Sequence, residues 1–108
     1  MDLTNLAIDI HSQNRAKGWY DGESLPPAVF HMLIVTELAE ATECLRHAEP
    51  AHYLTESGKP CGEAVEIADA LIRILDYCAY RGWDIDEIVR EKLAYNKTRS
   101  HRHGGKQF

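Results

Sequence analysis

The sequence has no long hydrophobic run, no basic N-terminal segment and few cysteines. No apolar stretch approaches the ~20 residues that a membrane-spanning helix needs, so we expect no membrane partner. Residues 1–15 lack a basic region followed by an apolar one, and so they do not resemble a secretory signal. These absences make a soluble, cytoplasmic protein the expectation.

The cysteine content and the net charge argue against further classes of protein. Cys44, Cys61 and Cys78 are odd in number and too far apart for a CxxC knuckle, so neither a disulfide framework nor a zinc ribbon is indicated. We expect reduced thiols. The net charge of −5 argues against a nucleic-acid polymer as partner, because such binding relies on clustered Lys and Arg. An acidic protein can still bind a phosphate when divalent cations intervene.

What is present is helical periodicity. The chain of 108 residues is expected to form one domain, residues 1–108, whose small core favours association with other copies. No β pattern or internal repeat is evident, which predicts an all-α fold with four main helices.

Apolar spacing and breaker residues place the helices over 3–16, over 28–47, from 63 to about 80, and from 84 onward. Residues 99–108 are expected to form a flexible tail.

Apolar stripes are expected to hold the second and third helices together. The second helix carries Phe30, Ile34, Leu38, Ala41 and Leu45 at helical spacing. The third carries Ile67, Leu71, Ile74 and Cys78. We expect these two stripes to face each other.

Two pairs of acidic residues flank these stripes. Glu37 and Glu40 project within about 60° of each other, and Glu66 and Asp69 have the same i, i+3 relation. If the helices pack by their stripes, four carboxylates converge and repel at a partly apolar seam, so a positive charge is required. Two sources are open at this point. Arg73 and Lys92 could form ordinary ion pairs, or the cation could be Mg²⁺, which takes oxygen ligands.

The sequence as a whole resembles a known family. "ELAE" (37–40) and "EIAD" (66–69) resemble the ExxE…ExxD signature of the MazG-like, all-α nucleoside triphosphate pyrophosphohydrolases. The ending "KLAYNKTRSHRHGGKQF" is similar to the K-x-x-x-N-x-x-R-P-x-x-H-G-G-K-x-F ending of many small members. Ser100 departs from that pattern, because it stands where proline is usual. "KGWYDG" before the second helix is also similar to small phage and bacterial members.

This resemblance implies a fold, a cofactor and a reaction. It implies a helical bundle completed in a homodimer or homotetramer, with Mg²⁺, or Mn²⁺ as a substitute, held by Glu37, Glu40, Glu66 and Asp69. It also implies hydrolysis of a nucleoside triphosphate, ribo or deoxyribo, to the monophosphate and pyrophosphate, with a role in adjusting nucleotide pools. Glu37 or Glu40 is the expected acceptor of a proton from the attacking water, and the sequence leaves open which.

Substrate-binding residues are expected outside the acidic pairs. Lys92, Asn96 and Arg99 share one face of the fourth helix, where the spacing alone also fits a solvated polar face. The resemblance favours contacts with phosphate and sugar for them, and contact with phosphates for Lys106. Trp19 is expected either to stack on the base or to anchor its loop. Asp76 and Glu63 are held in reserve as further metal ligands.

A second class of function also fits the acidic pairs. A non-catalytic helical interaction or regulatory protein could use the same carboxylates only to bind a cation. Product analysis after incubation with a nucleoside triphosphate separates the two hypotheses.

Overall fold

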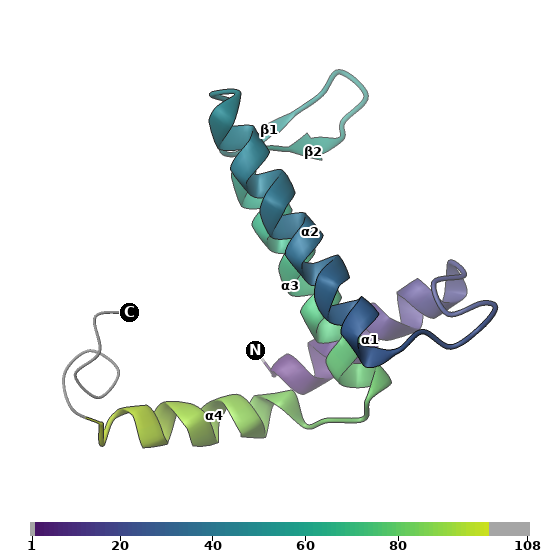
Figure 1. Cartoon of the computed structure of the whole chain (residues 1–108), viewed down its shortest axis with the longest axis vertical. Helices are drawn as coiled ribbons and strands as arrows, with labels where there is room; N and C mark the ends of the chain where they lie inside the picture. Colours follow the sequence, from purple (N-terminus) through teal and green to yellow (C-terminus); the bar gives the residue numbers. More distant parts are fainter. Residues whose placement is uncertain (1, 100–108) are drawn as a thin grey trace.

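A computed structural model describes residues 2–99 of the chain, and most of them are helical (Figure 1). Four helices follow one another within this range and confirm the all-α prediction: α1 (Leu3–Ala16), α2 (Pro27–Arg46), α3 (Glu63–Tyr80) and α4 (Ile85–Asn96). Their bounds agree closely with those expected from the apolar spacing. Residue 1 and residues 100–108 lie outside the described part, and so does most of the predicted tail.

The helices begin where the sequence supplies caps. Asp2 accepts a hydrogen bond from the Thr4 backbone nitrogen at 2.9 Å and caps α1. Asp84 caps α4 by accepting from the Glu87 nitrogen at 3.2 Å, in a D-x-x-E sequence typical of a capping box. Pro27 occupies the first position of α2. The N–H that proline lacks would have no acceptor within the helix at this position, so no helical hydrogen bond is lost. Local sequence therefore determines these three helix starts.

The segment between α2 and α3 is not the plain loop that its prolines and glycines indicated. It forms an antiparallel hairpin of β1 (Tyr53–Leu54) and β2 (Pro60–Cys61), in which Tyr53 pairs with Cys61 and Leu54 with Pro60. The sequence shows no β pattern here, because strands of two residues are too short for an alternating pattern to be visible. So short a hairpin leaves the fold all-α, as predicted.

Gly62 joins this hairpin to α3 in a conformation that suits glycine. Its φ is +116°, and a Cβ at this position would lie 2.4 Å from the Ala51 carbonyl oxygen. The Ala64 nitrogen donates to the same oxygen at 2.9 Å. The close approach ties the first turn of α3 to the chain leaving α2.

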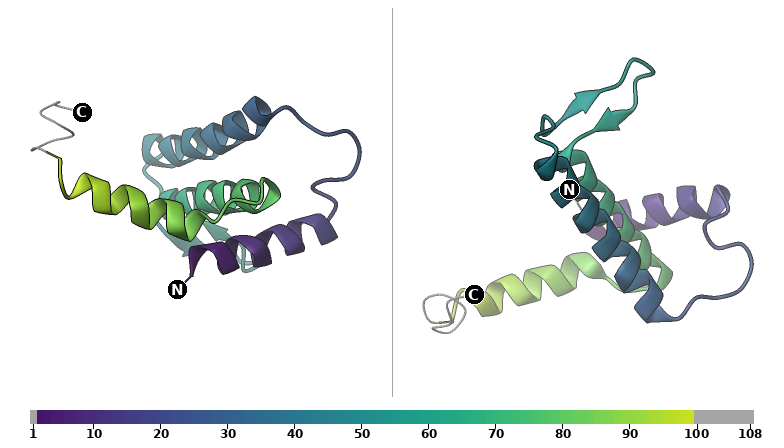
Figure 2. Two further views of the ribbon diagram at one scale, coloured as in Figure 1. Left: turned by 90° about the horizontal axis from the view of Figure 1, so that it is seen from below. Right: turned by 45° about the horizontal axis from the view of Figure 1, so that its top comes forward.

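The central helix of the arrangement is α3. It packs against α2 on one side and α1 on the other, as the two views of Figure 2 show. α4 leaves the end of α3 and extends away from the α2–α3 pair (Figure 1). The radius of gyration is 16.6 Å, compared with about 13 Å expected for a compact domain of this length.

Only the small members of the predicted stripes are buried, Ala41 of α2 and Cys78 of α3. Buried Cys44 of α2 and Ala70 of α3 lie on the same faces as the acidic residues. The expected burial of the large stripe residues was wrong. Five stripe residues are 38–60% exposed: Leu38, Leu45, Ile67, Leu71 and Ile74. The apolar spacing identified helix faces, but it did not reveal which face packs within one chain.

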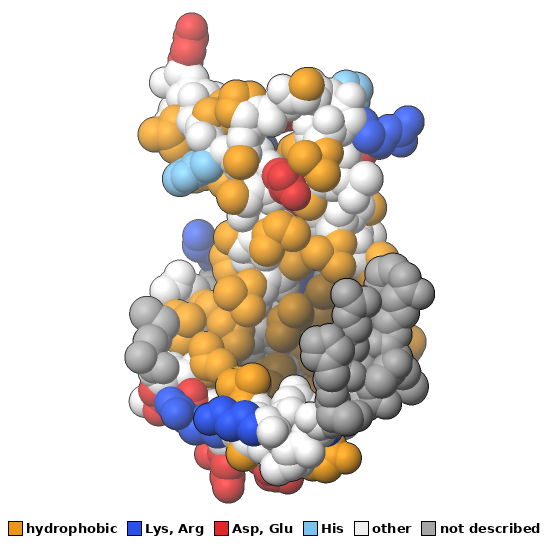
Figure 3. Space-filling model, turned by 90° about the vertical axis from the view of Figure 1, so that its left-hand side faces the viewer, with side chains coloured by type: hydrophobic (Ala, Val, Ile, Leu, Met, Phe, Trp, Pro, Cys, Tyr) orange, Lys and Arg blue, Asp and Glu red, His pale blue; other side chains and the backbone are white. Residues whose placement is uncertain are grey.

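Hydrophobic side chains consequently gather on the surface. Figure 3 shows them along the middle of one face of the molecule and in the hollow below it. Among residues 2–99, no large side chain is fully buried. None of the helices in this range is long and apolar enough to cross a membrane.

A buried carboxylate connects α1, the α1–α2 loop and α3. Asp76 is 2% exposed and accepts from Asn14 Nδ2 at 3.2 Å and from the Tyr20 hydroxyl, while His11 Nδ1 lies 3.0 Å from its Oδ1. Burial, followed by the hydrogen bond to Asp76, raises the pKa of Tyr20. Tyr20 stacks on Tyr80 at a centroid distance of 4.8 Å. This network fixes the loop that precedes α2.

Replacing Asp76 is expected to destabilise the fold strongly. Asp76→Ala leaves the groups of His11, Asn14 and Tyr20 without their common partner, so the free energy of unfolding should fall by about 3 kcal/mol. Urea denaturation followed by circular dichroism measures the change. Asp9→Ala, at an exposed position of α1, is the matched control and should change stability little. Equal effects of the two substitutions would contradict a structural role for the Asp76 network.

Candidate metal centre

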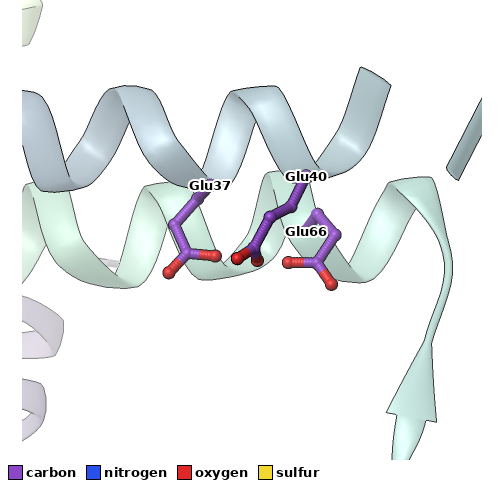
Figure 4. A group of neighbouring side chains, drawn as sticks. All are labelled: Glu37, Glu40 and Glu66. Atoms are coloured by element: carbon purple, nitrogen blue, oxygen red, sulfur yellow. The ribbon is translucent and has the colours of Figure 1, made fainter. Parts of the chain in front are cut away.

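Three carboxylates from two helices meet at the α2–α3 seam. Glu37 and Glu40 stand one turn apart on α2, and Glu66 lies in the first turn of α3. Each offers an oxygen, and these oxygens all lie within 4.8 Å of one another. Figure 4 shows the three side chains pointing into the same space between the helices. The structure therefore brings together three of the four residues predicted as metal ligands.

Arg73 is the cation nearest to this acidic cluster. Its Nε donates to Glu37 Oε1 at 2.8 Å, and the two side chains are 28% and 12% exposed. Asp69, one turn away on the same helix, is the partner that spacing alone would favour for Arg73. The structure instead uses Arg73 to bridge α3 to α2, because its long side chain reaches Glu37 on the other helix.

The pKa values of the carboxylates reflect how unevenly this positive charge is shared. Partial burial acts to raise the pKa of Glu37, but the hydrogen bond and charge of Arg73 outweigh it and hold that pKa below its ordinary value. Burial, followed by the hydrogen bond and charge of Glu40, raises the pKa of Glu66 to about 7. One guanidinium therefore leaves the Glu66 side of the cluster short of positive charge.

A polar atom without a partner marks the same deficit. Glu66 Oε2 is buried and accepts no hydrogen bond from the residues that the structure describes. A buried carboxylate oxygen without a donor is costly unless a cation supplies the missing interaction. The three carboxylates are hard oxygen donors of the kind that Mg²⁺ binds, usually together with water and substrate phosphates. The donor set of the acidic cluster therefore fits a divalent cation.

Asp69, the fourth predicted ligand, is not in this cluster. It lies one turn beyond Glu66 on α3, and its oxygens are not part of the set within 4.8 Å. Burial, followed by the negative charge of Glu37, raises the pKa of Asp69, while the charges of Arg73 and Lys59 partly oppose the shift. Asp69 therefore shares the electrostatic field of the cluster from its edge.

An aromatic cavity lies beside the acidic cluster. It has a volume of about 200 Å³ and is lined by Trp19, Tyr20, Leu25, Phe30, Leu33, Arg73 and Asp76. Pockets for drug-sized ligands run roughly from 300 to 1,000 Å³, so this one suits a single planar ring system. Arg73 connects the two features, because its guanidinium carbon lies 5.2 Å from the Trp19 ring centroid while its Nε bonds to Glu37. Trp19 is thus near the cluster, as its predicted role requires.

The predicted substrate-binding residues of α4 are not near the cluster within one chain. Glu66 is in the first turn of α3 and α4 follows its last turn, which is roughly 20 Å along the helix at 1.5 Å per residue. Lys92 Nζ instead lies 4.9 Å from the Tyr95 ring centroid, and the Arg99 guanidinium lies 5.9 Å from it. Asn96 is exposed on the same helix. Lys106 lies outside the described residues.

The sequence did not reveal the bridge of Arg73 or the structural role of Asp76. Asp76, held in reserve as a metal ligand, is instead bonded to α1 and to Tyr20. A signal for this was available in α1, where Asn14 continues the spacing of Leu3, Ala7 and Ile10 and is buried with a polar side chain. A polar residue on an apolar stripe indicates a buried hydrogen-bond partner. No comparable signal distinguishes a cross-helix partner for Arg73.

Comparison of the chain with protein-family models, with curated proteins and with solved structures gives no match. The likeness to the MazG-like pyrophosphohydrolases therefore stays a resemblance in sequence motifs.

The metal-free protein is expected to lose stability as pH rises toward neutrality. The pKa of Glu66 is about 7 in the folded chain and 4.5 ordinarily, so the folded state holds this proton more tightly than the unfolded state does. The contribution of Glu66 to the free energy of unfolding is therefore complete below about pH 4.5, and it is lost as the pH rises to about 7. Melting temperatures in EDTA across this range measure the effect. Glu66→Gln should flatten the decline, whereas Glu91→Gln on exposed α4 should not.

Proposed function

We propose that this protein is a Mg²⁺-dependent nucleoside triphosphate pyrophosphohydrolase, which converts its substrate to the monophosphate and pyrophosphate. The observation that carries the proposal is the acidic cluster, in which Glu37, Glu40 and Glu66 offer oxygens within 4.8 Å of one another and Glu66 Oε2 lacks a hydrogen-bond donor among the described residues. Hydrolysis between phosphates needs positive charge at the reacting oxygens, and these ligands can hold it.

The aromatic cavity gives the proposal a place for the base. Trp19, Tyr20 and Phe30 line it, and Trp19 is 46% exposed, so its ring is accessible to a planar partner. The cavity and the acidic cluster share Arg73, which puts a base site and a phosphate site within one side-chain length of each other. A nucleotide has the same order of parts, a planar ring at one end and phosphates at the other.

The chain's own residues divide the chemical work. Bound Mg²⁺ would neutralise phosphate charge and lower the pKa of a coordinated water. Glu37, Glu40 and Glu66 would hold the ion on two rigid helices, with Asp69 at the edge of the same field. Glu37 or Glu40 would accept the proton of the attacking water. Trp19 would orient the base, which places the phosphates against the carboxylates.

Self-association is part of the proposal. Apolar side chains of α2 and α3 are exposed, and α4 extends from the rest of the chain with no buried residue. In a homodimer or homotetramer the stripe of Ile67 and Leu71 would be covered, and the α4 residues Lys92 and Asn96 would approach a carboxylate cluster of another copy. The distance between α4 and the acidic cluster within one chain supports this arrangement, since the resemblance assigns both to one site.

The second candidate function is a non-catalytic interaction protein. The same exposed apolar faces favour it, because large apolar patches on a surface mark sites of association. It differs from the first candidate in predicting no turnover of any nucleotide.

A nucleotide panel is expected to separate the two candidates. With Mg²⁺, and again with Mn²⁺, chromatography of dCTP, dGTP and dUTP reactions should show monophosphate and pyrophosphate for at least one substrate. Glu37→Gln should lower the rate by 100-fold or more, on the order of the effect of losing a charged ligand, while the helical circular-dichroism signal stays intact. Glu43→Gln, on the exposed side of the same helix, is the matched control and should retain activity. Unchanged triphosphate throughout would favour the interaction protein.

The exposed stripe is expected to hold copies together. Leu71→Glu places a charge at the centre of this surface, so light scattering coupled to size-exclusion chromatography should show a smaller assembly than for the wild-type protein. Gln13→Glu adds the same charge at an exposed polar position of α1 and should leave the mass unchanged. A wild-type protein that runs as a monomer at high concentration would exclude this arrangement.

A further inference from the structure

Arg73 belongs to two features at once. Its Nε donates to Glu37 Oε1 in the acidic cluster at 2.8 Å, and its guanidinium carbon lies 5.2 Å from the Trp19 ring centroid at the aromatic cavity. It also lines the cavity, and its side chain is 28% exposed. The guanidinium is thus the one group in the described part of the chain that both contacts a carboxylate of the cluster and stacks on Trp19.

A divalent cation and this guanidinium compete for the same carboxylate. Glu37 Oε1 already accepts from Arg73, and a cation bound between Glu37, Glu40 and Glu66 would stand next to a like charge. Like charges in a partly buried seam repel with little screening. A cation that binds the acidic cluster therefore weakens the bond between Arg73 and Glu37.

The aromatic cavity offers the displaced side chain another position. Arg73 already contacts the Trp19 ring there, and Trp19 lies in the segment between α1 and α2, which has no regular secondary structure. Guanidinium groups bind phosphate oxygens through two parallel hydrogen bonds and also stack on aromatic faces. The Arg73 side chain lies between the aromatic cavity and the acidic cluster. It can therefore reach the anionic group of a ligand that binds to both.

We propose that Arg73 supplies the positive charge of the acidic cluster in the metal-free protein, and that a divalent ion displaces it from Glu37. The displaced Arg73 then acts as a substrate-positioning residue, which binds the phosphate next to the base. The inference rests on the proposed function, since it takes the acidic cluster to be a metal site. It assigns Arg73 a role that neither the acidic signature nor the tail motif contains.

If Arg73 is only a structural bridge, its removal should change the affinity for the divalent cation in the opposite direction. If Arg73 only ties α3 to α2, its removal should loosen the seam and weaken cation binding. If Arg73 is a competing cation, its removal should strengthen cation binding and weaken binding of a nucleotide. The two affinities therefore move in opposite directions only under the proposal.

The experiment uses Mg²⁺ alone and the fluorescence of Trp19. The chain has two tryptophans, so Trp83→Phe leaves Trp19 as the single reporter. Titration of this variant with Mg²⁺ should give a saturable fluorescence change as the guanidinium leaves Glu37 and changes its position relative to the Trp19 ring. Adding Arg73→Gln should abolish the change. Calorimetry should show Mg²⁺ binding several-fold tighter to Arg73→Gln than to the wild type, and a non-hydrolysable nucleoside triphosphate analogue binding at least several-fold more weakly.

Arg81 provides the matched control. Its guanidinium carbon lies 5.2 Å from the Trp83 ring centroid, and it bonds to Tyr77 rather than to a carboxylate of the cluster. Arg81→Gln, made with Trp83 present, should leave the Mg²⁺ affinity unchanged. Arg73→Lys keeps the charge without the planar fork, and should restore the wild-type Mg²⁺ affinity but not the affinity for the nucleotide analogue.

The outcomes distinguish this inference from the proposed function. Mg²⁺ binding that is equal or weaker in a folded Arg73→Gln, with wild-type binding present, overturns the role of Arg73 and leaves the metal centre standing. No Mg²⁺ binding to the wild type overturns both. Circular dichroism and melting temperature establish that each variant is folded before its affinity is compared.

Discussion

The structure depends on how negative charge is balanced at the α2–α3 seam. Three carboxylates offer oxygens within 4.8 Å of one another, and Arg73 bonds to one of them. Burial, followed by the hydrogen bond and charge of Glu40, raises the pKa of Glu66 to about 7, while the guanidinium bonds to Glu37. A protein that needed only a stable helix pair could place apolar side chains here. This excess of negative charge is what supports the proposal of a bound cation.

The composition of this seam also determines what the rest of the surface looks like. Small residues such as Ala41 and Ala70 let the two helices approach, so the acidic side chains and Arg73 can meet across them. The large apolar residues then lie on the outer faces, where Leu71 is 51% exposed. The radius of gyration of 16.6 Å and the exposed apolar side chains support the proposal that copies of the chain associate. The same packing faces that bring the carboxylates together leave these apolar side chains exposed.

The aromatic cavity depends on a second buried charge. Asp76 accepts a hydrogen bond from the Tyr20 hydroxyl, and Tyr20 lines the cavity together with Trp19. The loop between α1 and α2 has no regular secondary structure, so without this network little would fix its rings. Asp76 and Arg73 lie one turn apart on α3, and each organises one side of the same cavity.

The sequence by itself determined the helices, their starts and which acidic residues share a face of one helix. Caps, prolines and apolar spacing are local signals, so the bounds of α1 to α4 could be predicted closely, and the i, i+3 spacing of Glu37 and Glu40 placed them on one face. Only the tertiary structure decided that Arg73 crosses to Glu37, that Asp69 stands at the edge, and that Ile67 and Leu71 face outward. Spacing gives the direction of a side chain relative to its own helix axis. It does not give the rotation of one helix against another, which depends on residues far apart in the chain.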